Sequence, residues 1–368
     1  MADTTFLTRS TLDHARLGRD PRSRRGGLAA EARDEVVLSL AFRPPYDWVQ
    51  VRDFLATRAV PGLERVDGRG YARTVAAADG HAIVRVRPLG RGHALELRVR
   101  GAAPRALLAL ACAARRVFDV AADPARIAAV FRRDPLLASL VRRRPGLRIP
   151  GVWDPFECAV RAVLGQQVSV AAARTLAARL VARHGRPIAG GEDGLTHLFP
   201  TAAALADADL RGLGLTTGRA AALHALARAV SRGALDFTGP AAEVTAALFA
   251  LPGFGRWTAE YVALRALGEP DAFPAPDLVL RRMAAEGGTP LTASGLAARA
   301  GAWRPWRGYA ALHLWCAAGH ARGPHGTGRR GVGARVALLP RTSPRTPAAA
   351  SGPGPGAARP RLRRPPPR

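Results

Sequence analysis

Thirty residues in the last third of the chain constrain its fold more than any other stretch. They run from Leu251 to Leu280 as LPGFGRWTAEYVALRALGEPDAFPAPDLVL. Gly253 and Gly255 predict a tight turn, because glycine adopts backbone angles that a Cβ forbids. Where a helix begins after such a turn, backbone N–H groups face outward and can hold phosphate.

The rest of this stretch predicts two helices separated by a proline-rich loop. Trp257, Tyr261 and Leu264 recur at helical spacing and share one face. Three prolines then prevent the helix from continuing, and Asp277 begins the next one. A phosphate-facing turn about twenty residues before a lone acid predicts a site that holds a nucleic-acid backbone beside a catalytic carboxylate.

The charge balance favours a polyanionic partner. The 368 residues include 55 basic and 28 acidic side chains, which gives a net charge of +27, and every basic residue is arginine. Eleven of the arginines lie in residues 321–368, which contain no Asp or Glu; subtracting them leaves +16 for the rest of the chain. A charge of this size is typical of proteins that bind nucleic acid.

Cysteine usage and hydropathy exclude several classes of protein. Cys112, Cys158 and Cys316 form no CxxC pair, so they cannot hold an iron–sulfur cluster alone and do not indicate a disulfide scaffold. The N-terminus lacks the apolar segment of a signal peptide, and no run of about 18 apolar residues predicts a membrane span. We therefore expect a soluble cytoplasmic protein with no membrane partner.

Patterning along the chain predicts two folded domains between flexible ends. Residues 1–35 are polar and predict a flexible leader. Residues 36–118 predict an α+β domain with four or five antiparallel strands and two helices, one of them at Trp48–Arg58. Residues 119–322 show helical spacing almost throughout. Residues 323–368, rich in Arg, Pro, Gly and Ala, predict a disordered basic tail.

Several helix boundaries can be placed in the second domain. Asp154, Pro155 and Glu157 form the pattern of a helix start, with an N-cap aspartate and an acid at the third position. That helix ends near Leu164, where Gln166 and the residues beside it interrupt the pattern. The spacing predicts further helices at 123–133, 135–144, 168–184, 201–211, 217–232, 241–250, 291–300 and 306–318.

Five ordered segments together resemble a known family. They are PPYDW at 44–48, RPGLRIPG at 144–151, RAVLGQQVSVAAA at 161–173, LPGFGRWTAEYVALRA at 251–266 and WRPWRGYAALHLW at 303–315. These segments resemble the inducible alkylbase DNA glycosylases, the bacterial DNA-3-methyladenine glycosylase II family of the helix-hairpin-helix superfamily. The resemblance covers residues 36–320. It implies a TATA-binding-protein-like antiparallel sheet with two helices, followed by an all-α helix-hairpin-helix glycosylase body.

The resemblance implies that Asp277 is the catalytic carboxylate. C1′ of the nucleotide gains oxocarbenium character as the glycosidic bond breaks, and a nearby anion stabilises that charge in the transition state. A plain helix N-cap is the alternative role, and the two roles can coexist. The preceding residue is often acidic in the family, but here it is Pro276, which leaves Asp277 as the only local candidate for this role.

Trp257 occupies the position where bifunctional members of the superfamily carry a lysine that attacks C1′. An indole cannot form a Schiff base, and the chain contains no lysine. The resemblance therefore implies a monofunctional glycosylase, which removes the base, leaves an abasic site and does not cut the strand.

Four aromatic residues are expected to form the base pocket: Trp315, Tyr261 and Phe54, which match the family's pocket, and Trp257 as a further wall. Purines methylated at N3 or N7 carry positive charge, and an aromatic ring face attracts a cation by ~0.5–2 kcal/mol. A charged base also leaves readily, so no dedicated general acid is required. Ordinary core packing is the alternative for each of the four.

Contacts to DNA follow from the same resemblance. Gln167 lies where the family places a wedge that fills the gap left by the flipped base, a leucine in the best-known member; a simple loop residue is the alternative. Backbone N–H groups around Leu251, Gly253 and Gly255 are expected to bind phosphate, with Arg256 adding a contact, and a plain helix–helix turn is the alternative. The glycine-spaced segment at 210–223 is expected to be structural.

The superfamily often holds a monovalent cation on carbonyls of the hairpin, which here would be those of Phe249, Leu251 and Phe254. This Na⁺ or K⁺ ion would be structural, and no cofactor is required for the reaction.

We expect a monomeric bacterial enzyme that removes alkylated purines, of the 3-methyladenine and 7-methylguanine type, from double-stranded DNA and associates with the nucleoid. Two alternatives stay open: a catalytically silent helix-hairpin-helix DNA-binding protein, and a glycosylase for oxidised bases. No methyl-accepting cysteine domain is visible upstream, so a fused alkylation-response regulator is not expected.

Overall fold

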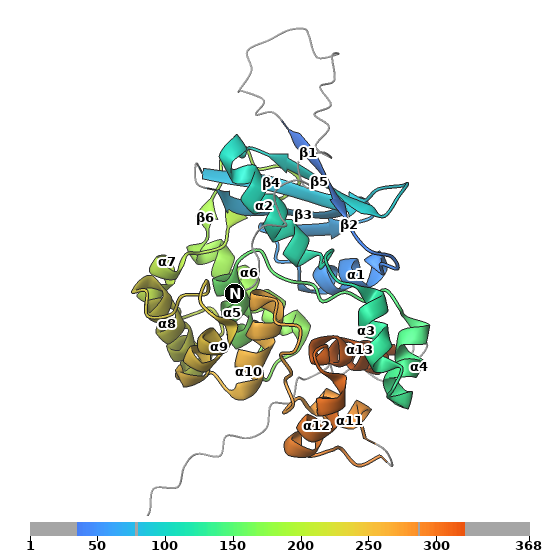
Figure 1. The fold of residues 1–368 in the computed structure, drawn as a ribbon. Helices are drawn as coiled ribbons and strands as arrows, with labels where there is room; N and C mark the ends of the chain where they lie inside the picture. Colours follow the sequence, from blue (N-terminus) through green and yellow to red (C-terminus); the bar gives the residue numbers. More distant parts are fainter. Residues whose placement is uncertain (1–34, 78–79, 286–287, 321–368) are drawn as a thin grey trace, which may run out of the picture. The chain divides into compact units, whose positions relative to one another are not determined.

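An antiparallel five-stranded sheet forms the first part of the structure (Figure 1). The computed structural model describes residues 35–77, 80–285 and 288–320, so residues 1–34 of the predicted leader and the predicted tail lie outside the described residues. The strands, in the spatial order β1-β5-β4-β3-β2, are β1 (Val36–Ala41), β2 (Glu64–Asp67), β3 (Gly70–Ala77), β4 (Gly80–Pro88) and β5 (Ala94–Arg100). The predicted α+β architecture is confirmed.

Alternating apolar residues give this sheet a buried side. Val84 lies opposite Val99 and Val86 opposite Leu97 in the antiparallel register, and all four side chains are buried. The two helices of this part, α1 (Trp48–Arg58) and α2 (Pro104–Val117), contribute Val51, Leu55, Leu110, Ala113, Ala114 and Val117 to the same core. Because strands and helices share one core, the sheet and both helices form one unit.

Apart from one short two-stranded sheet, the regular structure in the rest of the described chain is helical, as predicted. Its helices are α3 (Pro124–Phe131), α4 (Pro135–Arg143), α5 (Pro155–Leu164), α6 (Val170–His184), α7 (Ala202–Ala206), α8 (Thr217–Ser231), α9 (Ala241–Ala250), α10 (Arg256–Val262), the π-helix η1 (Ala263–Leu267), α11 (Leu278–Met283), α12 (Ala293–Arg299), the 3₁₀-helix η2 (Ala300–Trp303) and α13 (Arg307–His320). None of the helices formed by the described residues is long and apolar enough to cross a membrane.

These helices bury two separate apolar cores. One is built mainly by α5, α6, α8, α9 and α10, and the other by α3, α4 and α11 to α13. The π-helix joins them, because Ala263 and Leu264 belong to the second core although α10 belongs to the first. The chain thus passes from one core to the other within the stretch that carries Trp257 and Asp277.

Three local features differ from the sequence-based prediction. The helix expected at 201–211 ends at Ala206, because Asp209 accepts a hydrogen bond from the Arg211 N–H at 3.0 Å and closes a turn instead. A short two-stranded sheet, β6 (Arg186–Pro187) with β7 (His197–Leu198), was not expected. Neither was η1, and π-helical turns occur frequently at functional sites.

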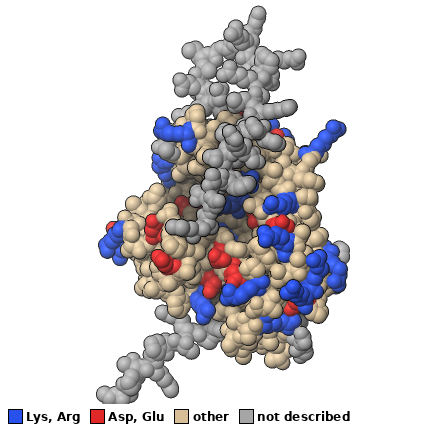
Figure 2. Space-filling view, viewed as in Figure 1, with Lys and Arg blue, Asp and Glu red and all other residues tan. Residues whose placement is uncertain are grey.

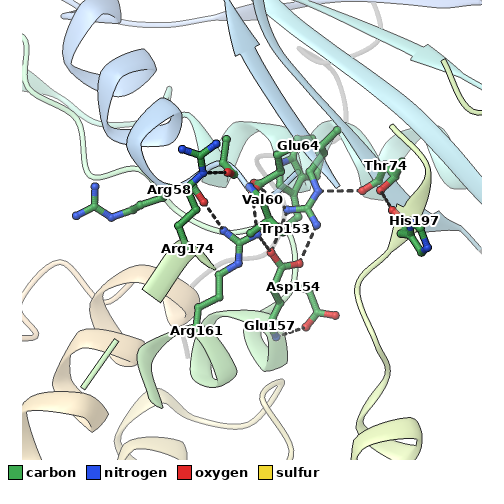
Figure 3. A network of polar contacts seen from close by, with 12 residues as sticks. Arg58, Val60, Glu64, Thr74, Trp153, Asp154, Glu157, Arg161, Arg174 and His197 are labelled. Carbon is green, nitrogen blue, oxygen red and sulfur yellow. Dashed lines mark hydrogen bonds and ion pairs between the residues drawn. The ribbon is translucent and has the colours of Figure 1, made fainter. Parts of the chain in front are cut away.

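Basic side chains outnumber acidic ones on the face seen in Figure 2, in keeping with the net charge of +27. One group of charges inside the molecule is balanced. Arg73 and Arg161 meet Glu64 and Glu157 in a buried cluster between the sheet and α5 (Figure 3).

Glu157 has a different role from the one its position in the sequence indicates. Asp154 caps α5 by accepting hydrogen bonds from the N–H groups of Phe156 at 2.7 Å and Glu157 at 3.3 Å, as predicted. The Glu157 carboxylate does not complete a capping box. It pairs with Arg73 of β3 at 2.7 Å and with Arg161 at 2.6 Å, and so fastens α5 to the sheet.

The substitution Glu157→Gln tests this cluster. It leaves the guanidinium groups of Arg73 and Arg161 with Glu64 as their only carboxylate partner among the described residues, and breaking a buried pair in this way costs about 3–5 kcal/mol. We expect a loss of that size in the free energy of unfolding, measured by urea titration. Asp207→Asn is the matched control, since it breaks the exposed pair with Arg228, worth at most about 1 kcal/mol. Equal losses in the two variants would contradict the interpretation.

Candidate active site

The turn between α9 and α10 contains one glycine that its geometry requires. Gly253 has φ +83°, and a Cβ there would lie 2.7 Å from the Cβ of Ala222 in α8. Gly255 has φ −86° and ψ 169°, and a Cβ there would meet no atom within 4 Å. The expectation that both glycines need angles forbidden to other residues is therefore wrong for Gly255. This glycine instead leaves the start of α10 open.

Gln166 connects this turn to the loop between α5 and α6. Its side-chain N–H group donates to the Gly253 carbonyl at 2.9 Å and to the Thr258 hydroxyl at 3.3 Å. Its own carbonyl accepts a hydrogen bond from Arg219 of α8. The neighbouring Gln167 is exposed, with φ +56°. Gln166 is thus more than a loop residue, because it fixes the segment that presents Gln167 relative to the turn.

Asp277 is buried at the start of α11, with 7% of its surface exposed. One carboxylate oxygen, Oδ1, accepts a hydrogen bond from the Leu280 N–H at 2.9 Å. The other, Oδ2, accepts one from Trp257 Nε1 at 2.9 Å. The structure therefore contains the N-cap that was the alternative role for Asp277, and it also fixes the second oxygen from a different helix.

Two aromatic rings extend from α10 beside this carboxylate. Trp257 and Tyr261 stack with their ring centroids 5.1 Å apart and their planes at 9°. The Tyr261 hydroxyl accepts a hydrogen bond from Arg265 Nη1 at 2.7 Å. Because Tyr261 covers one face of the Trp257 indole, the ring orientation and the position of its N–H group are both fixed.

Phe54 of α1 is covered by cations. The guanidinium carbon of Arg58 lies 3.8 Å from the centroid of its ring, and that of Arg265 lies 4.4 Å away. Arg265 also donates to the carbonyls of Pro150 and Gly151. A ring already in contact with two guanidinium groups is less accessible to a third cation than the sequence suggests.

A cavity of about 960 Å³ brings these groups together. Asp277, Trp257, Tyr261, Trp315 and Phe54 all line it, so five residues predicted from four distant segments lie around one space. Gln167, the residues of the α9–α10 turn and Arg256 do not line it. Its size and largely aromatic and apolar lining are typical of a small-molecule or base-binding site.

Four carboxylates line the cavity, and three of them are neutralised. Asp53 pairs with Arg52, and Glu64 and Glu157 pair with Arg73 and Arg161. Asp277 forms no ion pair with any of the described residues. Among the described residues, the Asp277 carboxylate therefore accepts hydrogen bonds only from N–H donors. Of the four carboxylates, Asp277 is the one whose charge is free to stabilise a developing cation.

The thiols at the cavity are not nucleophiles. Burial raises the pKa of Cys158 to about 11 and that of Cys316 to about 11, so both are neutral near pH 7. Since the thiolate is the reactive form, neither sulfur competes with Asp277 for chemistry at this site.

Three contributing residues were missed by the sequence analysis: Gln166, Arg58 and Arg265. The two arginines carry a signal that could have found them. Arg58 follows Phe54 by four residues and Arg265 follows Tyr261 by four, so each lies on the same helical face as a predicted pocket aromatic. Gln166 has no such signal, because its partners are more than 50 residues away in sequence.

The carbonyls proposed for a monovalent cation differ in what they contact. Leu251 already accepts a hydrogen bond from the Phe254 N–H at 3.1 Å, although a carbonyl oxygen has a second lone pair. Those of Phe249 and Phe254 accept no hydrogen bond from the described residues. Each of the three carbonyls therefore has a lone pair that no hydrogen bond from the described residues occupies, and the ion stays a prediction.

The two glycines of the turn provide a matched pair of variants. Gly253→Ala combines an unfavourable φ with a Cβ at 2.7 Å from Ala222, so we expect a loss of about 1–3 kcal/mol in the free energy of unfolding. Gly255→Ala should change it by less than about 1 kcal/mol, because nothing lies within 4 Å. Chemical denaturation measures both, and a reversed order would contradict the assigned geometry.

Comparison with known proteins identifies both parts of the chain. The family described as "AlkA N-terminal domain" matches residues 37–154, and "HhH-GPD superfamily base excision DNA repair protein" matches residues 160–304. The "3-methyladenine dna-glycosylase from Archaeoglobus fulgidus" has the same fold, with a TM-score of 0.68, 23% identity, and coverage of 77% of this chain and 99% of that chain.

Two curated relatives are more similar in sequence. "DNA-3-methyladenine glycosylase 2" of Escherichia coli (strain K12) is 39% identical over 285 residues, 75% of this chain and 96% of that protein. The "Probable bifunctional transcriptional activator/DNA repair enzyme AlkA" of Mycobacterium tuberculosis (strain CDC 1551 / Oshkosh) is 41% identical over 287 residues, 77% of this chain. The match spans 58% of the length of that second protein. The resemblance found in the sequence is thus confirmed, and the chain belongs to the DNA-3-methyladenine glycosylase 2 family of the HhH-GPD superfamily.

Proposed function

We propose that the protein is a monofunctional DNA glycosylase that removes alkylated purines from double-stranded DNA by hydrolysis of the N-glycosidic bond. One observation carries the proposal. Asp277 has no cationic partner among the described residues, and it lies in an aromatic-lined cavity with both of its oxygens oriented by N–H donors. The names of the relatives support the same class of reaction.

The carboxylate acts on charge that develops at C1′. As the glycosidic bond lengthens, the sugar becomes oxocarbenium-like, and an anion nearby stabilises the transition state more than the ground state. Trp257 and Leu280 hold the two oxygens in place before the substrate arrives, so little reorganisation is needed during the reaction. Water then adds to C1′, and the product is an abasic site.

Recognition of the damaged base relies on aromatic faces. A purine methylated at N3 or N7 is a cation, and its contact with an indole face contributes ~0.5–2 kcal/mol. Trp315 from α13 and Trp257 line the cavity without a guanidinium over their rings in the described contacts. Phe54 is covered by Arg58 and Arg265, so we assign direct contact with the base to the two tryptophans.

Two alternatives are less well supported. A silent DNA-binding protein would have no use for a buried carboxylate that lacks a cationic partner among the described residues, and burying such a charge costs stability. An oxidised-base enzyme of the lyase type would need an amine at C1′, and the chain has Trp257 and no lysine.

The DNA itself would be held outside the cavity. Gln167, exposed at φ +56°, is suited to enter the duplex where the flipped nucleotide has left. Backbone N–H groups of the α9–α10 turn and the exposed Arg256 would contact phosphates. A monovalent cation, if held by Phe249, Leu251 and Phe254, would supply further positive charge there.

The central test is Asp277→Asn. Asparagine keeps an oxygen for the Leu280 N–H, so folding should be preserved, but the charge that stabilises C1′ is lost. We expect single-turnover release of 7-methylguanine from methylated duplex DNA to slow by at least about 10²-fold. The wild-type product strand should stay intact until alkali is added. Full activity of the variant would refute the site, and absence of base release by the wild type, with DNA binding retained, would refute the reaction.

Trp257→Phe removes the indole N–H and keeps an aromatic ring at the cavity. Phenylalanine can still stack on Tyr261 but cannot donate to Asp277, and a hydrogen bond to a charged group is worth about 1.5–3 kcal/mol. We therefore expect a decrease of roughly 10- to 100-fold in the rate of base release. Trp306→Phe, which does not line the cavity, is the control and should leave the rate unchanged. A Trp257→Phe enzyme as fast as the control would show that the hydrogen bond has no catalytic effect.

A further inference from the structure

Five exposed arginines lie on one helical pair outside the cavity. Helices α3 and α4 and the turns that follow them carry this group, which we call the α3–α4 arginine face: Arg126, Arg132, Arg133, Arg142 and Arg143. Many blue side chains gather at the right of Figure 2, where Figure 1 places these helices. None of the five forms an ion pair with a carboxylate of the described residues.

The acids nearest in sequence are engaged elsewhere. Asp123 caps α3, and Asp134 caps α4 through the N–H groups of Leu136 and Leu137. Asp134 also accepts a hydrogen bond from Trp303 Nε1 at 2.8 Å. Neither carboxylate is therefore available to neutralise the arginines. Like charges placed together without counter-ions repel one another, so this face is complementary to an anion that comes from outside the chain.

The opposite side of the helical pair is anchored. Ile127, Phe131 and Leu137 are buried in the same core as α11 to α13. Because the apolar side fixes both helices, the arginines are presented on a rigid support. Arg132 and Arg133 precede α4 and Arg142 and Arg143 end it, so the two pairs lie one helix length apart, about 14 Å at 1.5 Å per residue. That distance equals about four base-pair steps of 3.4 Å.

The arginine face reaches the rim of the cavity. Arg144, the residue directly after α4, lines the cavity and is held by Asp47 at 2.6 Å. Helix α13, which carries Trp315, packs against α4. If a damaged nucleotide of a polyanion enters the cavity, the backbone next to that nucleotide would therefore contact the arginines.

We infer that the α3–α4 arginine face binds the sugar–phosphate backbone of duplex DNA on one side of the flipped nucleotide. The inference rests on the proposed function, and it adds a contact surface separate from the α9–α10 turn. Guanidinium groups suit phosphate because their N–H donors match its oxygens in pairs. An acidic protein segment is the competing partner, but it would have no reason to meet the cavity rim.

The test compares two triple variants of the full chain. Arg133→Gln, Arg142→Gln and Arg143→Gln together remove three charges from the face. The control removes three charges from exposed arginines in other elements that form no ion pair with the described residues: Arg69→Gln, Arg91→Gln and Arg232→Gln. Binding is measured by fluorescence anisotropy over a salt series, on a duplex of about 30 base pairs with a central abasic-site analogue. Two further duplexes have one flank or the other trimmed to about three base pairs.

We expect the face variant, but not the control, to bind the full duplex at least about 10-fold more weakly, with a salt slope lower by about 2–3. The face variant should lose the same affinity for the trimmed duplex that keeps the contacted flank. It should lose no affinity for the trimmed duplex that lacks this flank. Unchanged binding, or an equal loss on all three duplexes or in both variants, would overturn the inference; unchanged binding would favour an acidic protein partner. Base release by the wild type reports separately on the proposed function.

Discussion

The hydrogen bond from Trp257 to Asp277 is the contact on which the site depends. It joins residues of α10 and the start of α11 that are 20 positions apart in the sequence, and between them the chain passes through a π-helix and a proline-rich loop. Without this bond the carboxylate would be fixed only by its own helix. With it, both oxygens are oriented, and Trp257, predicted to occupy the lysine position of lyase-type enzymes, orients the proposed catalytic carboxylate.

Charge balance explains why one acid at the cavity differs from the rest. The buried cluster of Arg73, Arg161, Glu64 and Glu157 neutralises itself and fastens the sheet to α5 (Figure 3). For Glu64, burial raises the pKa, but attraction to Arg161 and Arg73 outweighs it, so the pKa is lowered overall. The cluster thus stays ionised near neutral pH, and its contribution to stability is lost only as the pH falls through the lowered pKa. Asp277 has no such neutralising partner in the part of the chain that the structure describes.

Local sequence patterns predicted the helices and strands well, but they did not predict contacts between residues far apart in the sequence. The helix bounds at Trp48–Arg58 and Ala241–Ala250 were predicted from the spacing of apolar residues. The π-helix was not predicted from the sequence, because it lies where the chain passes from one apolar core to the other. Glu157 was read as a capping residue because Arg73, its partner, is 84 residues away.

In the candidate site, too, the sequence predicted which residues take part but not all of the contacts between them. Asp277, Trp257, Tyr261, Trp315 and Phe54 were found through a family resemblance, and the structure places all of them around one cavity. The resemblance could not reveal that Phe54 is covered by Arg58 and Arg265, since that depends on tertiary packing. Nor could it reveal Gln166, whose hydrogen bond joins the loop between α5 and α6 to the α9–α10 turn.

A crystal structure of the Asp277→Asn protein bound to a duplex with one alkylated purine would test the central claim most directly. The account predicts the damaged base between Trp257 and Trp315, and C1′ of its nucleotide within about 3.5 Å of the residue-277 side chain. A flipped base held elsewhere, or a C1′ atom that the side chain at 277 cannot approach, would contradict it.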